Sequence, residues 1–544
     1  MTKNDKICKN RQLVNFRPVC FFALFVGLTV IICMISRDVG FWLVFVWIGL
    51  LILFFVAMNA WNNKKGFRGT CLKAIGSSKI FFASTLLLCL AVIISFGVTQ
   101  VVFENQRSFI GEGQLRGTIT SFTIRDDTFL DEGRANIVLN NATFMGQRIT
   151  GRVRVNLTAQ DEEVLESLRS LGFGTVVSLN TTLSASNSSP FNVNNRIRYT
   201  TSHRGRGLIF HGSSSDARMS VMRYTYNYFN RHMSEQSATL MYSMLFGDRS
   251  SLDSDIRESF SATGLAHVLA VSGLHVGMVV GLLVGVMHIL KMPKKPQFFI
   301  IFCTLLLYLF LADFRYSIMR AAIMFLVMVF NRLFVRRVDL FSSICMAMVI
   351  VLVLFPFSIM SVSFQLTFGC MIGIALLYRP LYRFCNKVLC FGKNENAQKK
   401  WIQWFRKFIS GTIALDLSTS VAVFPFIVLY FGAYPAFSIL TNLFLLPLLV
   451  IAFKLSVIAL VTFIGSPLLY WADIFTRGVI HATNWISSIN AQVAFNINGY
   501  WFLFYFIGLF LLSRFIFIEK KTIRYSLAGI SFAIYGFAIL LFNV

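Results

Sequence analysis

The stretch Ile-Phe-Phe-Ala-Ser-Thr-Leu-Leu-Leu-Cys-Leu-Ala-Val-Ile-Ile-Ser-Phe-Gly-Val-Thr-Gln-Val-Val, residues 80–102, holds no Asp, Glu, Lys or Arg. A run of this length crosses a hydrocarbon core of about 30 Å as a helix. In lipid only helices and closed barrels satisfy every backbone hydrogen bond, so the run predicts a spanning helix. Similar runs lie at residues 298–312, 318–335 and 527–542. We therefore expect an α-helical polytopic membrane protein with roughly a dozen spans.

The composition supports this fold class. Of 544 residues, 56% are hydrophobic and only 14% are charged, a balance too apolar for a soluble protein. Residues 19–35 follow a basic stretch and resemble a signal peptide, but no small-residue cleavage site follows them and the next apolar run, 41–60, begins at once. We expect a retained first span and a domain of N-terminal transmembrane helices over residues 1–103.

The positive charge orients the chain. The formal net charge is +26, and in membrane proteins such an excess gathers in cytoplasmic loops. Basic clusters lie at residues 3–11, 64–79, 291–295, 332–337, 379–407 and 520–524. Assigning all of them to the cytoplasm predicts a multi-pass protein of a bacterial cytoplasmic (inner) membrane, with a cytoplasmic N-terminus, the segment 104–218 outside and the C-terminus outside.

Short alternating stretches between residues 113 and 180 indicate β-strands. In Arg-Ile-Thr-Gly-Arg-Val-Arg-Val, residues 148–155, the side chains of Arg148, Arg152 and Arg154 share one face, and aliphatic residues alternate with them. About five such strands predict a small extracytoplasmic OB-like β-barrel over residues 104–205. Ten arginines balance ten acidic residues between 104 and 200. Both DNA contact through the arginine face and a purely structural role therefore stay open.

Two segments have the spacing of amphipathic helices. Apolar residues recur at 219, 222, 226, 229 and 233, which predicts interfacial helices over residues 206–247, ahead of a transmembrane channel domain over 248–544. In residues 471–489 an apolar stripe runs opposite Asp473, Arg477, Asn484 and Ser488. We expect this second helix to lie at the membrane interface or to line a water-filled cavity.

The most informative stretch is Phe-Ser-Ala-Thr-Gly-Leu-Ala-His-Val-Leu-Ala-Val-Ser-Gly-Leu-His-Val-Gly-Met, residues 260–278, which leads into a helix with glycine at every fourth position. Small residues at this spacing form a bare stripe that lets another helix approach closely in lipid. The stripe is compatible with packing inside one chain or with a homodimer. Its members are Gly273, Gly277, Gly281 and Gly285.

Three polar residues lie at the outer end of this helix: His267, Ser272 and His275. Polar groups at membrane depth are costly unless they are paired or hydrated. A nucleophilic Ser272 with a histidine base is one interpretation, but no G-x-S-x-G elbow surrounds it. We favour hydrogen bonds that tie a broken helix to its neighbours.

Several stretches together resemble the ComEC competence-protein family. The first is Leu-Phe-Gly-Asp-Arg-Ser, residues 245–250, followed by Thr-Gly-Leu-Ala-His-Val-Leu-Ala-Val-Ser-Gly-Leu-His-Val, residues 263–276. Three more are Ser-Ile-Met-Arg-Ala-Ala-Ile-Met (317–324), Ser-Phe-Gln-Leu-Thr-Phe (363–368) and Asn-Leu-Phe-Leu-Leu-Pro (442–447). With the N-terminal helices and the OB-like region, the resemblance covers most of the chain.

The resemblance implies a membrane channel that passes one strand of incoming DNA into the cytoplasm during natural transformation. A polyanion needs a wet path with cationic and polar walls. Arg320 leads the pore candidates because it lies inside an apolar segment, and its alternative role is an ion pair with Asp313 or Asp416. The full set of channel-lining or DNA-contact candidates is Arg249, His267, Ser272, His275, Arg315, Arg320, Gln365, Asn442 and Lys454.

Many members of that family continue into a metallo-β-lactamase-like domain, which needs an H-x-H-x-D-H metal cluster. The seven histidines of this chain contain no such cluster, and no G-x-x-x-x-G-K-[ST] phosphate loop is present. We therefore expect no enzymatic activity, no catalytic metal and no cofactor. The expected partners are single-stranded DNA, membrane lipid, an outer DNA receptor, a separate nuclease, and a cytoplasmic helicase or strand-binding proteins. The alternatives are a secondary transporter for a smaller solute and a membrane hydrolase built on Ser272 and His275.

Overall fold

The computed structural model describes the chain in segments, which are residues 18–39, 43–44, 46–50, 79–104, 110–127, 132–149, 151–159, 175–186, 197–203, 209–213, 217–247, 252–269, 272–334, 340–389, 400–462, 465–489 and 492–494, with a few single residues besides. The chain divides into two compact units. The first unit comprises residues 1–97, 334–439 and 492–544, and the second comprises 98–333 and 440–491. The predicted barrel, the predicted interfacial helices and the start of the predicted channel domain thus share the second unit.

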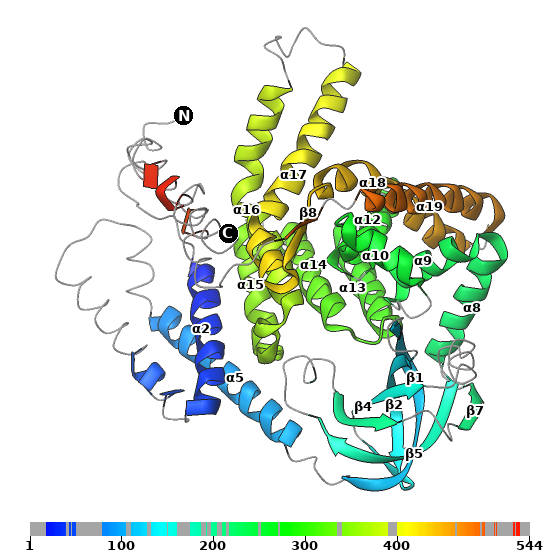
Figure 1. Ribbon diagram of the computed structural model, residues 1–544. Coiled ribbons are helices and arrows are strands. Elements are labelled where there is room, and N and C mark those ends of the chain that lie inside the picture. Colours follow the sequence, from blue (N-terminus) through cyan, green and yellow to red (C-terminus); the bar gives the residue numbers. More distant parts are fainter. Residues whose placement is uncertain are drawn as a thin grey trace. The chain divides into compact units, whose positions relative to one another are not determined.

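A small β-barrel forms one part of the second unit (Figure 1). Five strands close into a ring in the order β1-β2-β4-β6-β5-β1, in which β4 and β6 run parallel and the other neighbours antiparallel. Closure leaves no free strand edge in the ring. The strands are β1 (Gly111–Asp127), β2 (Glu132–Phe144), β4 (Arg152–Ala159), β5 (Thr175–Ala185) and β6 (Ile197–His203); the short β3 (Gln147–Arg148) pairs with β2 and β7 (Ile209–Ser213) with β5.

Alternation of residues sets the barrel interior. Val153 and Val155 on β4 are fully buried, and so are the residues opposite them on β2, Leu139 and Ile137. The predicted single strand over 148–155 is wrong at one point, because Gly151 has φ +107° and separates β3 from β4. Glycine adopts this conformation without a steric cost, and an added Cβ would collide with the Arg198 side chain.

Two helices, α8 (Ala217–His232) and α9 (Glu235–Phe246), lie within the segment 206–247 where we expected amphipathic helices. The predicted apolar positions of α8 are mostly buried. Every residue of α9 from Ser237 to Phe246 is buried, so protein encloses most of this helix. Its end is set by Gly247, which has φ 76° and donates its N–H to the Ser243 carbonyl oxygen.

The second unit continues through a series of helices that pack into one apolar core with α8 and α9 (Figure 1). The core contains Phe260, Val276, Leu305 and Phe453, all of them nearly inaccessible. The helices are α10 (Ser254–Ala262), α11 (Ala266–Leu269), α12 (Gly273–Ile289), α13 (Lys294–Leu311), α14 (Tyr316–Phe334), α18 (Ser438–Thr462) and α19 (Gly465–Ser488).

Helix α19 buries one residue of its predicted polar face, Asp473, and leaves part of its apolar stripe exposed, while Arg477, Asn484 and Ser488 are exposed as well. Asp473 and Thr476 are buried, whereas Trp471 and Trp485 of the predicted apolar stripe are exposed. The helix therefore places a polar side chain against the protein and aromatic side chains on the surface. Exposed Trp and Tyr side chains are typical of membrane interfaces.

The first unit contains α2 (Pro18–Val39), most of α5 (Lys79–Glu104), α15 (Leu340–Leu354), the 3-10 turn η2 (Pro356–Met360), and the paired helices α16 (Val362–Val388) and α17 (Lys400–Phe431). The small strands β8 (Ala433–Pro435) and β9 (Gln492–Ala494) also pair there. Helices α16 and α17 lie side by side along much of their length (Figure 1). The two helices approach each other closely at Gly373, where a Cβ would collide with Ala422 and the carbonyl oxygen of Ser418.

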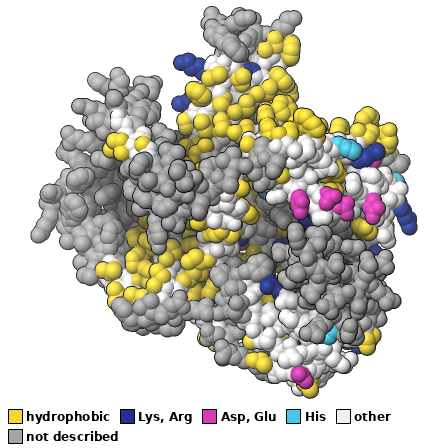
Figure 2. Space-filling model, in the orientation of Figure 1, with side chains coloured by type: hydrophobic (Ala, Val, Ile, Leu, Met, Phe, Trp, Pro, Cys, Tyr) yellow, Lys and Arg dark blue, Asp and Glu magenta, His cyan; other side chains and the backbone are white. Residues whose placement is uncertain are grey.

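Five helices in the described segments are long and apolar enough to cross a membrane: residues 83–101, 294–311, 362–388, 401–431 and 438–462. Shorter apolar helices lie at 22–36, 273–289, 316–331 and 340–354. Figure 2 shows hydrophobic side chains over much of the α16–α17 pair, where Trp401, Trp404 and Phe431 are exposed. Large apolar side chains on a surface in this number suit lipid and not water. The chain is a membrane protein that is mostly helical and carries a small five-stranded barrel.

Candidate functional site

Ser272 and His275 form a helix cap at the start of α12. The Ser272 hydroxyl accepts a hydrogen bond from the Leu274 N–H at 3.2 Å, and the His275 ring nitrogen Nδ1 accepts one from the Ser272 N–H at 3.1 Å. This reciprocal arrangement is a capping box that satisfies the exposed amides of the first turn. Nδ1 lies 3.4 Å from the Ser272 oxygen, but because it already accepts the amide hydrogen it is not placed as a base. The geometry favours a structural cap over a nucleophile.

The α10–α12 segment is held by α18. His275 is fully buried, with its ring at the edge of Phe453, 5.6 Å between centroids. The Thr441 hydroxyl donates to the Thr263 carbonyl oxygen at 2.8 Å, and both threonines are buried. Two of the stretches that we singled out, 263–276 and 442–447, thus lie next to each other although they are far apart in the sequence. His267, also predicted, lies at the surface on α11 and contacts the Gly264 carbonyl oxygen.

The predicted glycine stripe divides into two halves. A Cβ on Gly277 would meet the Phe325 ring of α14 at 3.1 Å, and one on Gly273 would meet Ala321 at 3.6 Å. The first two glycines therefore let α12 approach α14 closely. Around Gly281 and Gly285 a Cβ would meet nothing within 4 Å. The second half of the stripe lies beyond this contact and is exposed.

The start of α14 joins α13 and α9. Arg315, which precedes α14, donates a hydrogen bond to the carbonyl oxygen of Gly247, the residue that ends α9. The Tyr308 hydroxyl donates to the carbonyl oxygen of Leu245 at 3.1 Å. The stretches 245–250 and 317–324 are therefore neighbours as well. The contact that Arg315 makes here is with the protein backbone and is therefore structural.

The remaining predicted residues lie at several places. Arg320 is buried on α14, at 2% exposure, and Lys454 and Asn442 are partly exposed on α18. Gln365 belongs to α16 in the first unit, where it accepts a hydrogen bond from the Tyr430 hydroxyl at 2.7 Å. Asp416 lies on α17 of the same unit. Arg249 lies outside the described residues.

Asp313, one of the two acids considered as a partner of Arg320, forms ion pairs with two other arginines. Arg152 of strand β4 contacts it at 2.6 Å and Arg218 of helix α8 at 3.3 Å. The two guanidinium groups come from the barrel and from the helix that follows it. This contact fastens the barrel to the turn between α13 and α14. Sequence reasoning missed it because no local pattern connects residues 152, 218 and 313.

The other two arginines of the predicted barrel face differ from Arg152. Arg148 is exposed on β3, and Arg154 is partly buried on β4, where burial lowers the pKa of its guanidinium. Arginine titrates so far above neutral pH that Arg154 stays a cation. The three arginines thus occupy three environments, because the break at Gly151 removes Arg148 from the β4 face.

A buried carboxylate joins α9 and α19, and sequence reasoning missed its role. Asp473 accepts hydrogen bonds from the Ser234 N–H at 3.1 Å and the Ser234 hydroxyl at 2.7 Å, and it pairs with Arg477 at 2.7 Å. Burial acts to raise the pKa of Asp473, but the hydrogen bonds from Ser234 and Ser237 and the charge of Arg477 outweigh it, so the net pKa is lowered. A negative charge at the start of α9 also suits the helix dipole.

The tight contact of α16 with α17 was also missed. Its signal is present in the sequence, since Gly369 and Gly373 have the small-x-x-x-small spacing of packed membrane helices. Both glycines contact α17. The same rule that identified the stripe on α12 would have found this second pair.

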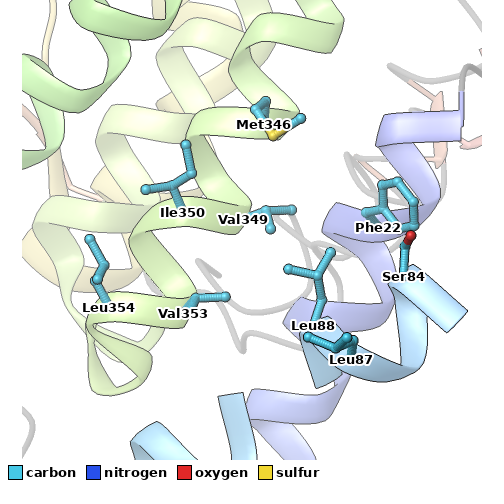
Figure 3. A pocket seen from close by; sticks show the side chains of 9 residues that line it. All are labelled: Phe22, Ser84, Leu87, Leu88, Met346, Val349, Ile350, Val353 and Leu354. Atoms are coloured by element: carbon cyan, nitrogen blue, oxygen red, sulfur yellow. The ribbon is translucent and has the colours of Figure 1, made fainter. Parts of the chain in front are cut away.

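An apolar cavity lies in the first unit. It measures about 500 Å³ and is lined by side chains of α2, α5 and α15 (Figure 3). Leu87, Leu88, Val349 and Val353 are among these side chains. Apart from the Ser84 hydroxyl these walls offer no hydrogen-bond donors for phosphate oxygens, so this cavity does not suit a nucleic acid. Among the described residues no group of three or more His, Cys, Asp and Glu side chains could hold a metal ion.

The sequence model of the competence protein family matches residues 244–520, which include the end of α9 and the helices α10 to α14, α18 and α19. This chain belongs to the competence protein family. It is 26% identical over 158 residues to ComE operon protein 3 of Bacillus subtilis, which is 29% of this chain and 20% of that relative. It is 28% identical over 172 residues to Recombination protein 2 of Haemophilus influenzae, 30% of this chain and 21% of that relative.

The matched part of this competence-family chain thus spans about a fifth of the length of each curated relative. No solved structure matches the chain. The resemblance predicted from residues 245–276, 317–324, 363–368 and 442–447 is confirmed by the family match, since all of these stretches lie within it.

Proposed function

We propose that this competence-family chain is a membrane channel that passes single-stranded DNA into the cytoplasm during natural transformation. The observation that carries the proposal is the convergence of four family stretches in the second unit. The end of α9, the capped start of α12, the start of α14 and the start of α18 contact one another through the Arg315–Gly247, Gly273–Ala321 and Thr441–Thr263 contacts.

The cations on these segments support a polyanionic substrate. Arg315, Arg320 and Lys454 lie on α14 and α18 or just before them, within otherwise apolar surroundings. Charged side chains in membrane segments are costly and therefore tend to be functional. Phosphodiester backbones bind such cations with a strong salt dependence. Arg320 is the leading residue for the channel wall because it lies within the helix and not at its end.

For the barrel, we propose an OB-like fold that contacts the incoming strand. Without the short β3, the ring order is first, second, third, fifth and fourth strand, with the third and fifth parallel. OB folds bind oligonucleotides on the face of their second and third strands, which are β2 and β4 here. On β4 that face presents Arg154 opposite Val138 of β2 and Thr200 of β6.

The location and partners follow from this function. We propose a bacterial cytoplasmic membrane, with the N-terminus in the cytoplasm and the barrel outside, where it meets the strand first. A DNA receptor and a nuclease would act on the outer side, and a helicase or strand-binding proteins would act in the cytoplasm. The open glycines Gly281 and Gly285 offer a helix face to a second copy of the chain.

The test is DNA import in cells that lack the chain. Labelled double-stranded DNA is supplied to the deletion strain with and without the wild-type gene, and DNA protected inside the cytoplasm is measured together with transformation frequency. The proposal expects label to remain outside the cytoplasm in the deletion strain only. Unchanged import in the deletion strain would contradict a channel and favour a transporter for a smaller solute.

A further inference from the structure

The turn between α13 and α14 places one carboxylate in a fixed position. Asp313 and Phe314 have φ of 59° and 47°, a left-handed conformation that aspartate tolerates better than most residues. The Phe314 N–H donates to the Leu309 carbonyl oxygen at 2.8 Å and the Asp313 N–H to that of Phe310 at 3.2 Å. These bonds close the end of α13. The Asp313 side chain therefore projects from a rigid turn and not from a flexible loop.

Two guanidinium groups meet on this carboxylate. Arg152 contacts one carboxylate oxygen at 2.6 Å, and Arg218 contacts the other at 3.3 Å while its Nε donates to the Leu311 carbonyl oxygen at 3.0 Å. The three side chains carry two positive charges and one negative charge. The Arg152 and Asp313 side chains are 18% and 17% exposed and the Arg218 side chain is 9% exposed, so solvent and ions reach the site from the Arg152 side.

This geometry is one that binds phosphate. Arginine is the side chain that best matches the paired oxygens of carboxylate and phosphate groups, and two arginines on one anion share its two oxygens. Arg154 lies two residues after Arg152 on the same face of β4, about 7 Å away at the rise of a strand. A strand bound at Arg154 would therefore reach Arg152 next.

We propose that Asp313 is an internal substitute for a DNA phosphate. It holds the Arg152 and Arg218 guanidinium groups together in the absence of DNA, and a backbone phosphate of the incoming strand takes its place between them. The site rests on the proposed function, since it needs a single strand on the outer face of the barrel. Asp313 thereby lowers the affinity of the resting protein for nucleic acid and keeps the phosphate site assembled.

The test measures binding of fluorescent oligo-deoxythymidine by the full chain in nanodiscs, over a range of salt concentrations. Asp313→Asn keeps the shape of the side chain and removes the competing charge. We expect it to tighten binding about tenfold, the scale of one charge-assisted hydrogen bond, and to steepen the salt dependence by about 0.7 for each added phosphate contact. Asp255→Asn is the matched control, because Asp255 is an exposed acid of the same unit and its loss changes the net charge equally.

A second set of variants separates the phosphate site from a general charge effect. In the chain carrying both Arg152→Gln and Arg218→Gln, binding should weaken, and adding Asp313→Asn should give no gain. If Asp313→Asn alone does not fold, the weaker binding of the double arginine variant still tests the phosphate site. If the wild-type chain binds the oligonucleotide and none of these changes alters its affinity, the phosphate site is overturned and the channel proposal stands. A wild-type chain that binds no oligonucleotide would overturn both.

Discussion

The barrel and the helices of the second unit separate polar from apolar groups in different ways. In the barrel, every second residue of β4 is inside and aliphatic, and the arginines are outside. In the helices around α12, polar groups are buried among the apolar ones, including Thr263, His275 and Arg320. The barrel therefore depends on hydrophobic burial, which is non-directional. The helices share an apolar core too, but specific buried hydrogen bonds, such as that from Thr441 to Thr263, add to it and fix which neighbours meet.

The largest effect should come from a charge placed inside the barrel. Val153→Asp puts a carboxylate where the wild-type side chain is fully buried. Burial of an unpaired charge should cost more than about 4 kcal/mol, enough to unfold a small domain. Limited proteolysis and membrane abundance of the full chain would show this. The control is Asn136→Asp, on the outward side of β2, whose free energy of unfolding should stay within about 0.5 kcal/mol of wild type. If both variants were destabilised equally, burial of the charge inside the barrel would not be the cause.

The next effect concerns function and not folding. Arg320→Gln removes a buried cation from α14 and retains a long polar side chain. If Arg320 lines the path, DNA import should fall about tenfold or more, because one charge-assisted contact with phosphate is lost. Membrane abundance and detergent melting temperature should stay near wild type. Import that remains normal would remove Arg320 from the channel wall and assign it to packing alone.

The contact between α9 and α19 should give a smaller, pH-dependent effect. Asp473→Asn weakens the bonds to Ser234 and the ion pair with Arg477, and should cost about 1–3 kcal/mol. The folded pKa is lowered from its usual 3.8. The stability that the ionised carboxylate contributes is therefore complete above pH 3.8 and is lost as the pH falls through the lowered value.

Thermal unfolding in detergent between pH 3 and pH 7 would measure this contribution. Wild type and Asp473→Asn should differ most at neutral pH and converge in acid. A constant difference over the whole range would mean that the charge of Asp473 has no part in holding α9 to α19.

The smallest effect compares two positions of the glycine stripe. Gly281→Ala should stabilise α12 by about 0.5–1 kcal/mol, since alanine is the better helix former and nothing lies within 4 Å of the new methyl group. Gly277→Ala should lose this gain, because its methyl group would press on Phe325. Melting temperatures would rank the variants. A destabilising Gly281→Ala that also abolishes a dimer would show instead that a second copy packs on this half of the stripe.

Much of the fold follows from the sequence for simple physical reasons. The long apolar runs predict spanning helices because lipid cannot satisfy backbone hydrogen bonds, and α5 matches the run at 80–102 closely. The alternation at 152–157 predicts the inside and outside of β4. The burial of Asp473 on α19 could not be predicted in this way, because it depends on hydrogen bonds from Ser234, a residue more than two hundred positions earlier in the sequence.

The candidate site shows the same division. Local spacing located Ser272, His275 and the glycines of α12, since a cap and a helix stripe are properties of a single helix. The membership in the competence family is likewise a property of the sequence. Which side chains meet was decided by the tertiary structure. From the sequence alone, Asp313 could pair with any cation. It pairs with Arg152 and Arg218 because β4 and α8 fold against the α13–α14 turn. An ion pair depends on distance in space and not on separation along the chain.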